Sequence, residues 1–393
     1  MREAVIAAFG RSGIGKYKKG GLAYARPEDF AGQVVKGIME RNPQLLPEMV
    51  EDVIVGCAQP EGEQGFNIAR VIAINAGLPY TACGQTINRF CSSGLQAVAT
   101  AANAIMAGQA DCIIAGGVES MSRIPMGGYS LLPDPQLIAK NRDVYYGMGI
   151  GAEIVADKFN VSRMDMDEYS LKSHQKAMAA IDSGKFKDEI IPVTAQRPAT
   201  DTKGNPAIQN FIFSEDEGVR RNANLNDLQK LKPVFKNNGK ITAGNSSQMN
   251  DGAAFLVLMS AEKAMEAGIK PVAKFKGYSL AGVEPAMFGM APVPAIQKVL
   301  KQTGQKLENI DLMELNEAFA AQVIPVIREL KINPDIVNVN GGAIALGHPL
   351  GCSGAYLSIK LLQELKRRKA KYGIVTMCIG VGMGAAGVFE MIP

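Results

Sequence analysis

Two cysteines and one histidine stand in segments rich in glycine and serine. Cys91, in NRFCSSGLQ, comes where a helix is expected to begin, with Ser92 or Ser93 as the predicted cap. His348, in NGGAIALGHPLGCSG, lies in a loop without a helical face, and Cys378, in CIGVGMG, follows a predicted strand. Successive glycine N–H groups after Cys378 can form an anion-binding concavity. A nucleophilic thiol, a base and backbone N–H donors together suit acyl transfer through a thioester.

The position of Cys91 at a helix N-terminus favours a reactive thiol. Unpaired N–H groups and the positive end of the helix dipole stabilise a thiolate. An ordinary cysteine has a pKa of about 8.5 and is only a few per cent ionised at pH 7, so we expect the dipole and a partner base to raise that fraction. The plainer alternatives are that Cys91 is a small buried residue and His348 a structural histidine. The second histidine, His174 in DEYSLKSHQKAM, is predicted on a solvated helix face.

Two stretches of the sequence repeat one pattern, and this pattern provides the elements that position these residues. The first contains EDVIVGCAQ, CSSGLQAVATAANAIMAG and DCIIAGG, and the second contains IDLMELNEA, GCSGAYLSIKLLQEL and YGIVTMCIG. The spacings agree, because Asp52 to Cys91 is 39 residues and Asp311 to Gly351 is 40. We infer an internal duplication with two α/β halves. A pseudo-twofold axis between them would bring two helix N-termini together and place Cys91 beside His348.

Composition excludes several classes of protein. The 393 residues are 47% hydrophobic and 20% charged, and the net charge of +4 is too small to indicate a nucleic-acid partner. No apolar run reaches the roughly 18 residues of a membrane span, and the N-terminus reads as a strand instead of a secretory signal, so a cytoplasmic location is expected. The six cysteines form no C-x-x-C pair and are expected as free thiols, so a structural zinc site is not predicted. GRSGIGKY carries Tyr17 where a phosphate loop needs Ser or Thr.

Six segments resemble the signature blocks of the thiolase family, in the family's order and over the whole chain. They are NRFCSSGLQA, GGVESMSR, TAGNSSQMNDGAA, NEAFA, NGGAIALGHPLGCSGA and CIGVGMG. The strongest likeness is to bacterial degradative 3-ketoacyl-CoA thiolases, and biosynthetic acetoacetyl-CoA thiolases follow closely. The resemblance implies an α/β fold of two similar halves in five α-β-α-β-α layers. It implies an N-terminal half of residues 1–120 and 249–270, an inserted loop domain of residues 121–248, and a C-terminal half of residues 271–393.

The resemblance also implies roles for five residues. Cys91 is expected to be the nucleophile that carries the acyl group, and His348 to take its proton. Cys378 is expected to be the acid/base on the acetyl carbon. Asn316, in NEAFA, is expected to hold a water that forms one oxyanion hole with His348, while the backbone N–H groups of Cys91 and Gly380 form the other.

Coenzyme A is implied as a substrate, with no metal and no tightly bound cofactor. Ser247 is expected to contact the pantetheine arm and Arg220 the adenosine phosphate end. Met148 and Phe319 complete the expected substrate-binding residues. A homodimer or homotetramer is the implied assembly.

Some features differ from the family pattern, and other functions compete. Val381 stands where the family usually has glycine, Gly151 where it often has threonine, Ile154 where it often has asparagine, and Ser12-Gly13 where it often has Thr-Pro. The extra apolar volume at residues 151 and 154 is expected to affect acyl-chain preference.

Three other functions compete with the degradative thiolase. The first is a biosynthetic acetoacetyl-CoA thiolase. The second is a ketoacyl-synthase-type condensing enzyme, which usually needs a second His or an Asn, and the third is a non-catalytic acyl-CoA or sterol carrier, which normally lacks the cysteine pair.

Overall fold

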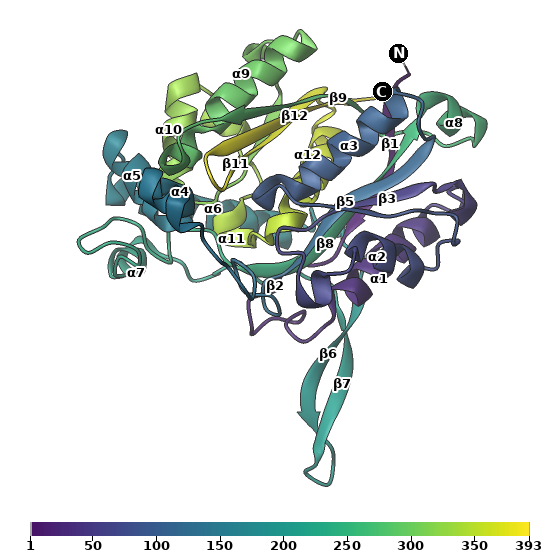
Figure 1. The fold of residues 1–393 in the computed structure, drawn as a ribbon, viewed down its shortest axis with the longest axis horizontal. Coiled ribbons are helices and arrows are strands. Elements are labelled where there is room, and N and C mark those ends of the chain that lie inside the picture. The colour runs from purple at the N-terminus through teal and green to yellow at the C-terminus, as the bar shows by residue number, and fades with distance from the viewer. Residues whose placement is uncertain (1, 393) are drawn as a thin grey trace.

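The computed structural model describes residues 2–392, and one continuous mixed sheet forms its centre (Figure 1). The strand order is β10-β11-β12-β9-β1-β8-β5-β3-β4, with the short β2 paired to β8. The strands of the N-terminal half are β1 (Ala4–Arg11), β2 (Gly15–Lys16), β3 (Asp52–Gly56), β4 (Gln85–Ile87), β5 (Cys112–Ser120) and β8 (Asn250–Ser260). Those of the C-terminal half are β9 (Ala273–Gly282), β10 (Leu312–Leu315), β11 (Tyr372–Ile379) and β12 (Met383–Met391).

The two halves of the sheet have the same topology. In the N-terminal half β3 is parallel to β5, β5 is antiparallel to β8, and β8 is antiparallel to β1. In the C-terminal half β10, β11, β12 and β9 repeat these relations in the same order. The halves join where β1 pairs with β9 through Val5↔Lys274 and Ile6↔Ala273. The predicted duplication is therefore confirmed.

Helices cover both faces of each half and make five layers (Figure 1). Residue alternation along β3 explains this, because Val53 and Val55 pack outward against α1 and α2 while Ile54 packs inward against α3. Helices α3 and α12 form the middle layer between the two halves, and α9 and α10 cover the outer face of the C-terminal half. The helices are α1 (Pro27–Arg41), α2 (Ile68–Asn75), α3 (Ser93–Met106), α8 (Ala261–Glu266), α9 (Pro292–Thr303), α10 (Ala320–Leu330), α11 (Ala343–Leu346) and α12 (Leu350–Arg368).

Two glycines let α3 and α12 touch backbone to backbone. A Cβ at Gly94 would come within 2.8 Å of the Gly351 oxygen and the Ala355 nitrogen. A Cβ at Gly354 would come within 2.2 Å of the Leu95 nitrogen. Any larger residue would push the helices apart. The first turns of these two helices therefore lie against each other.

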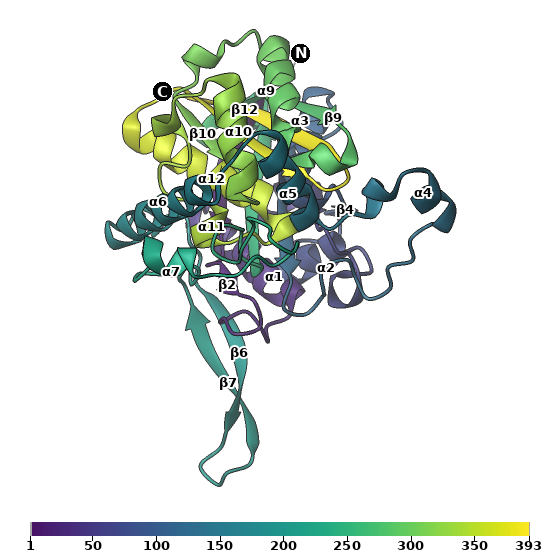
Figure 2. The ribbon, with the colours of Figure 1, turned by 90° about the vertical axis from the view of Figure 1, so that its left-hand side faces the viewer.

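The segment between β5 and β8 lies outside the duplicated pattern. It contains α4 (Pro135–Lys140), α5 (Met148–Lys158), α6 (Arg163–Asp182), β6 (Val193–Thr200), β7 (Pro206–Phe213) and α7 (Leu225–Gln229). The β6–β7 hairpin projects far from the body of the molecule (Figure 2), whereas α5 and α6 pack against α10. The limits of a loop domain at residues 121 and 248 stay a prediction. Within residues 2–392, no helix has the length and hydrophobicity of a membrane span.

One prediction about α6 is wrong. His174 is not solvated but only 3% exposed, and its Nδ1 accepts a hydrogen bond of 3.2 Å from the backbone N–H of Arg220. Burial, and secondarily the charge of Arg220, lower the pKa of His174 to about 4. The residues next to His174 in the sequence are mostly polar, so the sequence did not indicate that the 217–220 segment covers this side of α6.

Candidate active site

Cys91 lies in a tight turn just ahead of helix α3. The turn is the 3₁₀ helix η3 (Phe90–Ser92), and Phe90 before the cysteine adopts a left-handed φ of 44°. The Ser93 hydroxyl accepts from the Arg89 N–H at 2.8 Å and donates to the Phe90 carbonyl at 2.7 Å, which fastens the turn. The prediction that Ser92 or Ser93 caps the helix is wrong, because neither side chain accepts a hydrogen bond from its first turn. Ser93 holds the strained turn instead.

His348 lies between α11 and α12 and is held from three sides. Its backbone N–H donates to Asn250 Oδ1 at 3.1 Å. Its ring Nε2 lies 3.3 Å from Asn316 Nδ2, and its Nδ1 lies 2.6 Å from Ser353 Oγ. The side chain is 4% exposed. The structure thus brings together His348 and Asn316, as the sequence predicted, and adds Ser353, which the sequence analysis missed.

Cys378 and Gly380 lie where β11 turns into β12, on the other side of Cys91. Cys378 is buried in a cluster with Phe319 and the partly buried Met148. The backbone N–H of Gly380 acts to lower the pKa of Cys91, and the charge of Cys91 acts to raise the pKa of Cys378. These interactions bring the two cysteines and Gly380 to one place.

Burial sets the protonation of all three titratable groups. It raises the pKa of Cys91 to about 12, against the opposing effect of the Gly380 and Cys91 backbone N–H groups. It lowers the pKa of His348 to about 4. Burial, followed by the charge of Cys91, raises the pKa of Cys378 well above its usual range. Burial therefore opposes the enlarged thiolate fraction expected from the helix dipole, and favours a neutral Cys91 thiol and a neutral His348 imidazole before substrate binds.

Asn316 is positioned by a backbone hydrogen bond to the sheet, and the next residue, Glu317, is anchored to helix α6. The Asn316 N–H donates to the Thr376 carbonyl at 3.0 Å, and among residues 2–392 no donor reaches its buried Oδ1. Glu317 accepts from Tyr169 at 2.9 Å and from Ser173 at 2.7 Å, both on α6. An acid inside the apolar NEAFA segment was a signal in the sequence that such a buried anchor exists.

Glu119 is a second buried anchor that the sequence analysis missed. Its carboxylate accepts from the N–H of Gly351 at 2.7 Å and of Ala58 at 2.8 Å, and from Gln64 Nε2 at 2.8 Å. It is 1% exposed at the end of the all-buried strand β5. Because Gly351 begins the helix after His348, Glu119 fixes α12 to the N-terminal half. An acid that ends an otherwise apolar strand could have revealed it.

Two of the predicted coenzyme A residues, Ser247 and Arg220, lie in segments that contact the NEAFA segment and helix α11. Ser247 is partly buried and its N–H donates to the Ala318 carbonyl at 2.9 Å, next to Phe319. Gln248 donates to the carbonyls of Gly218 and Ile344, both at 2.9 Å, so the 217–220 segment lies against α11. Arg220 is exposed on that segment.

Met148 and Phe319 contact the cysteine end of the site. A Cβ built on Gly380 would meet Phe90 at 3.6 Å and the Met148 sulfur at 3.7 Å. The Phe319 ring packs edge-on against Phe288, with centroids 6.4 Å apart. An apolar wall therefore lies beside Cys378.

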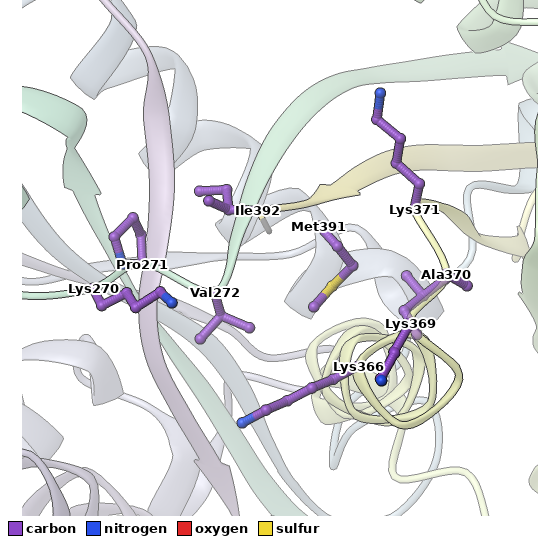
Figure 3. Close-up of a pocket in the computed structure, with 10 residues that line it drawn as sticks. Lys270, Pro271, Val272, Lys366, Lys369, Ala370, Lys371, Met391 and Ile392 are labelled. Atoms are coloured by element: carbon purple, nitrogen blue, oxygen red, sulfur yellow. The ribbon is translucent and has the colours of Figure 1, made fainter.

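A solvent-open hollow of about 690 Å³ lies elsewhere, at the C-terminal end of α12 (Figure 3). Its lining contains none of the predicted site residues and includes Lys270, Val272, Lys366, Lys369, Lys371 and Met391. Lysines at the C-terminal turn of a helix complement its unpaired carbonyl groups, which is a structural role. In the described part of the chain, no group of three or more His, Cys, Asp and Glu residues could hold a metal ion.

Comparisons with known proteins agree along the full length. The family model for the thiolase N-terminal domain matches residues 4–262, and that for the thiolase C-terminal domain matches residues 269–391. The chain is 51% identical to the 3-ketoacyl-CoA thiolase of Bacillus subtilis (strain 168), over 100% of both chains. It is 46% identical to the peroxisomal 3-ketoacyl-CoA thiolase 5 of Arabidopsis thaliana, over 99% of this chain and 85% of that one. The crystal structure of the Bacillus anthracis acetyl-CoA acetyltransferase matches with a TM-score of 0.90 and 39% identity, over 100% of this chain and 99% of that chain.

The duplicated five-layer fold and these matches define the class as an enzyme that transfers acyl groups. The chain belongs to the thiolase family.

Proposed function

We propose that the protein catalyses the CoA-dependent cleavage of 3-ketoacyl-CoA to acetyl-CoA and a shortened acyl-CoA, as in fatty acid β-oxidation. The observations that carry this are the contact of Asn316 with His348, the interaction of Cys378 with Cys91, and the packing of Cys91 against Leu350, two residues after His348. Full-length relatives with 42–51% identity named 3-ketoacyl-CoA thiolase support the same reaction. Coenzyme A is a substrate in this reaction, because its thiol takes up the acyl group. Thiolases hold no tightly bound cofactor.

The first half of the reaction breaks a C–C bond. Cys91 attacks the C3 keto carbon while His348 Nε2 takes the thiol proton, and the backbone N–H groups of Cys91 and Gly380 hold the oxyanion. When the C2–C3 bond breaks, its electron pair forms the enolate of acetyl-CoA. Protonated His348, together with a water held by Asn316, stabilises the enolate oxygen. Cys378 then protonates C2, and acetyl-CoA leaves.

The second half returns the enzyme to its starting state. The thiol of coenzyme A gives its proton to the Cys378 thiolate and attacks the acyl group on Cys91. The Cys91 sulfur leaves and recovers the proton that His348 held. The burial of Cys378 suits its role, because a raised thiol pKa keeps Cys378 protonated until the enolate forms. Loss of one oxyanion donor in such a site typically costs about 10²–10³ in rate.

The insertion is proposed to bind coenzyme A, with Ser247 at the pantetheine arm and Arg220 at the adenosine phosphate end. Support comes from the Gln248 contacts, which hold both segments against the loop that leads to His348. Met148 and Phe319 are proposed to line the thioester and acyl portion. The exposed guanidinium of Arg220 suits a phosphate, because arginine pairs with phosphate in a bidentate manner.

The acyl pocket is proposed to depend on Phe288. A Cβ at Gly151 would come within 2.6 Å of the Phe288 ring, so glycine there makes room for that ring beside Phe319. Ile154 is partly buried and packs against the neighbouring core of the C-terminal half. The biosynthetic alternative, condensation of two acetyl-CoA, uses the same residues in reverse and is favoured by the structural match to an acetyl-CoA acetyltransferase.

A homodimer or homotetramer in the cytoplasm is the proposed form of the enzyme. Exposed aromatic residues near the edge strand β4, Phe66 and Tyr80, support a subunit contact, since they are 97% and 83% exposed. Light scattering after gel filtration measures the assembly, and a monomer would contradict the proposal.

Initial rates with acetoacetyl-CoA and with a longer 3-ketoacyl-CoA, at fixed coenzyme A, test the function. The degradative proposal expects CoA-dependent loss of both, with the longer substrate cleaved at least as efficiently. Cleavage of acetoacetyl-CoA alone would favour the biosynthetic alternative. No cleavage of either would favour a carrier and contradict the proposal.

A further inference from the structure

The Ser353 hydroxyl occupies a defined place between His348 and the start of α12. Ser353 Oγ donates to the Pro349 carbonyl, one helical turn back, at 2.8 Å. The same oxygen lies 2.6 Å from His348 Nδ1. Ser353 is 1% exposed, so solvent does not compete for either contact.

This geometry decides which ring nitrogen carries the proton. A serine hydroxyl has one hydrogen and two lone pairs, and its hydrogen is already directed at Pro349. Toward His348 it therefore presents a lone pair, and Nδ1 must be the N–H donor. In a neutral imidazole the other nitrogen, Nε2, is then the acceptor.

The other side of the ring supports the same tautomer. Asn316 Nδ2 lies 3.3 Å from His348 Nε2 and carries only donor hydrogens. A proton on Nε2 would set two donors against each other.

We propose that Ser353 is a positioning residue, whose hydroxyl accepts the Nδ1–H of His348 and thereby keeps Nε2 unprotonated, as the base that takes the Cys91 proton when Asn316 yields its contact with Nε2. The inference rests on the role proposed for His348. After proton transfer the Nδ1–H stays on Ser353, Asn316 no longer donates to Nε2, and the new Nε2–H is available to the developing enolate oxygen. One hydroxyl thus serves both the base step and the oxyanion step.

The chain offers a matched control on the same helix. Ser358 is also fully buried on α12, and its hydroxyl likewise donates to the carbonyl four residues back, Gly354, at 2.7 Å. Among the described residues, the Ser358 hydroxyl forms no hydrogen bond with the ring of His348. Ser358→Ala therefore reproduces the loss of a buried helical hydroxyl without touching the histidine.

Selective ¹⁵N labelling of histidine reads the tautomer directly, because the chain has only His174 and His348. In the wild-type protein, the ring nitrogens of His348 should show the Nδ1–H tautomer. Those of His174 should show the opposite one, because its Nδ1 accepts from the backbone. His174→Gln assigns the two rings. A wild-type His348 in the Nε2–H form would overturn the proposal, and this result needs no variant and no activity.

The two serine variants then test the consequence. Ser353→Ala should move His348 toward the Nε2–H form and lower kcat by about threefold to tenfold, the change expected from one neutral hydrogen bond. KM for coenzyme A should stay the same, and Ser358→Ala should match wild type in both. An unchanged tautomer and kcat in Ser353→Ala, or an equal loss in Ser358→Ala, would overturn the proposal. If wild type shows the Nδ1–H tautomer but no thiolysis, the proposed function fails while the proton assignment stands.

Discussion

The contact between α3 and α12 at Gly94 should be necessary for activity, and Gly94→Ala tests it. The added Cβ would lie 2.8 Å from the Gly351 oxygen and the Ala355 nitrogen, both of which are backbone atoms. Ordinary contacts begin at 3.4 Å, so the helices must separate by about 0.6 Å. Helix propensity favours alanine by at most about 1 kcal/mol, whereas overpacking costs about 1–3 kcal/mol, so overpacking wins.

The separation moves Cys91 away from His348, because each leads into one of these helices. A 1 Å misplacement costs about 10²-fold in rate, so about 0.6 Å should cost roughly tenfold in kcat. Urea unfolding should show a loss of up to about 2 kcal/mol, the excess of overpacking over helix propensity. Gly282→Ala is the matched control, since nothing lies within 4 Å of its added Cβ. A Gly94→Ala enzyme as active and as stable as Gly282→Ala would refute the reasoning.

Three further predictions concern the turn, the substrate and pH. Val381 has a φ of 63° and Gly382 a φ of 76°, and a turn with two such residues favours the sequence Asn-Gly. Val381→Asn should therefore raise the free energy of unfolding by about 1–2 kcal/mol. A lower urea midpoint would contradict this. Ser247→Phe should raise KM for coenzyme A more than it lowers kcat, and a pure kcat effect in steady-state kinetics would contradict uniform binding. Burial lowers the pKa of His174 to about 4, from the ordinary histidine value of about 6.5, so the unfolded state binds more protons between these pH values and stability falls as pH falls through this window. His174→Gln should remove up to about 3 kcal/mol of that fall in urea unfolding at pH 6.5 and 4, and an unchanged slope would contradict the buried histidine.

Much of the fold could be predicted because duplication leaves a pattern in the sequence itself. The spacing from Asp52 to Cys91 and from Asp311 to Gly351 predicted two halves with adjacent helix N-termini, and Gly94 and Gly354 make that contact. The prediction that Cys91 and His348 share a site rested on this symmetry.

The predictions about His174 and the pKa of Cys91 were wrong because both depend on contacts with segments distant in the sequence. His174 looks solvated in its own helix, yet the 217–220 segment buries it. The pKa of Cys91 follows from burial by neighbours, and local sequence reveals only the helix dipole. Ser353 was missed for a different reason: it lies only five residues after His348, but the composition of its helix does not indicate that its hydroxyl meets the imidazole ring. Val381 stands where the family usually has glycine, and the turn adopts a left-handed conformation at this residue despite the branched side chain.

The central claim is that the two buried cysteines do different work, Cys91 holding the acyl group and Cys378 moving a proton on the acetyl carbon. Cys112→Ala is the control, because Cys112 is equally buried but packs in the outer core with α1 and α2. It should behave as wild type.

The most direct measurement compares two half-reactions of Cys378→Ala. Acetyl transfer from acetyl-CoA to Cys91 forms no carbanion, so mass spectrometry should still find the acetyl-enzyme, although it should form more slowly because Cys378 no longer gives a proton to the departing CoA thiolate. Exchange of the methyl hydrogens of acetyl-CoA with deuterium from solvent requires the acid/base, so it should be lost together with C–C bond cleavage. Methyl exchange at the wild-type rate in Cys378→Ala would contradict the account.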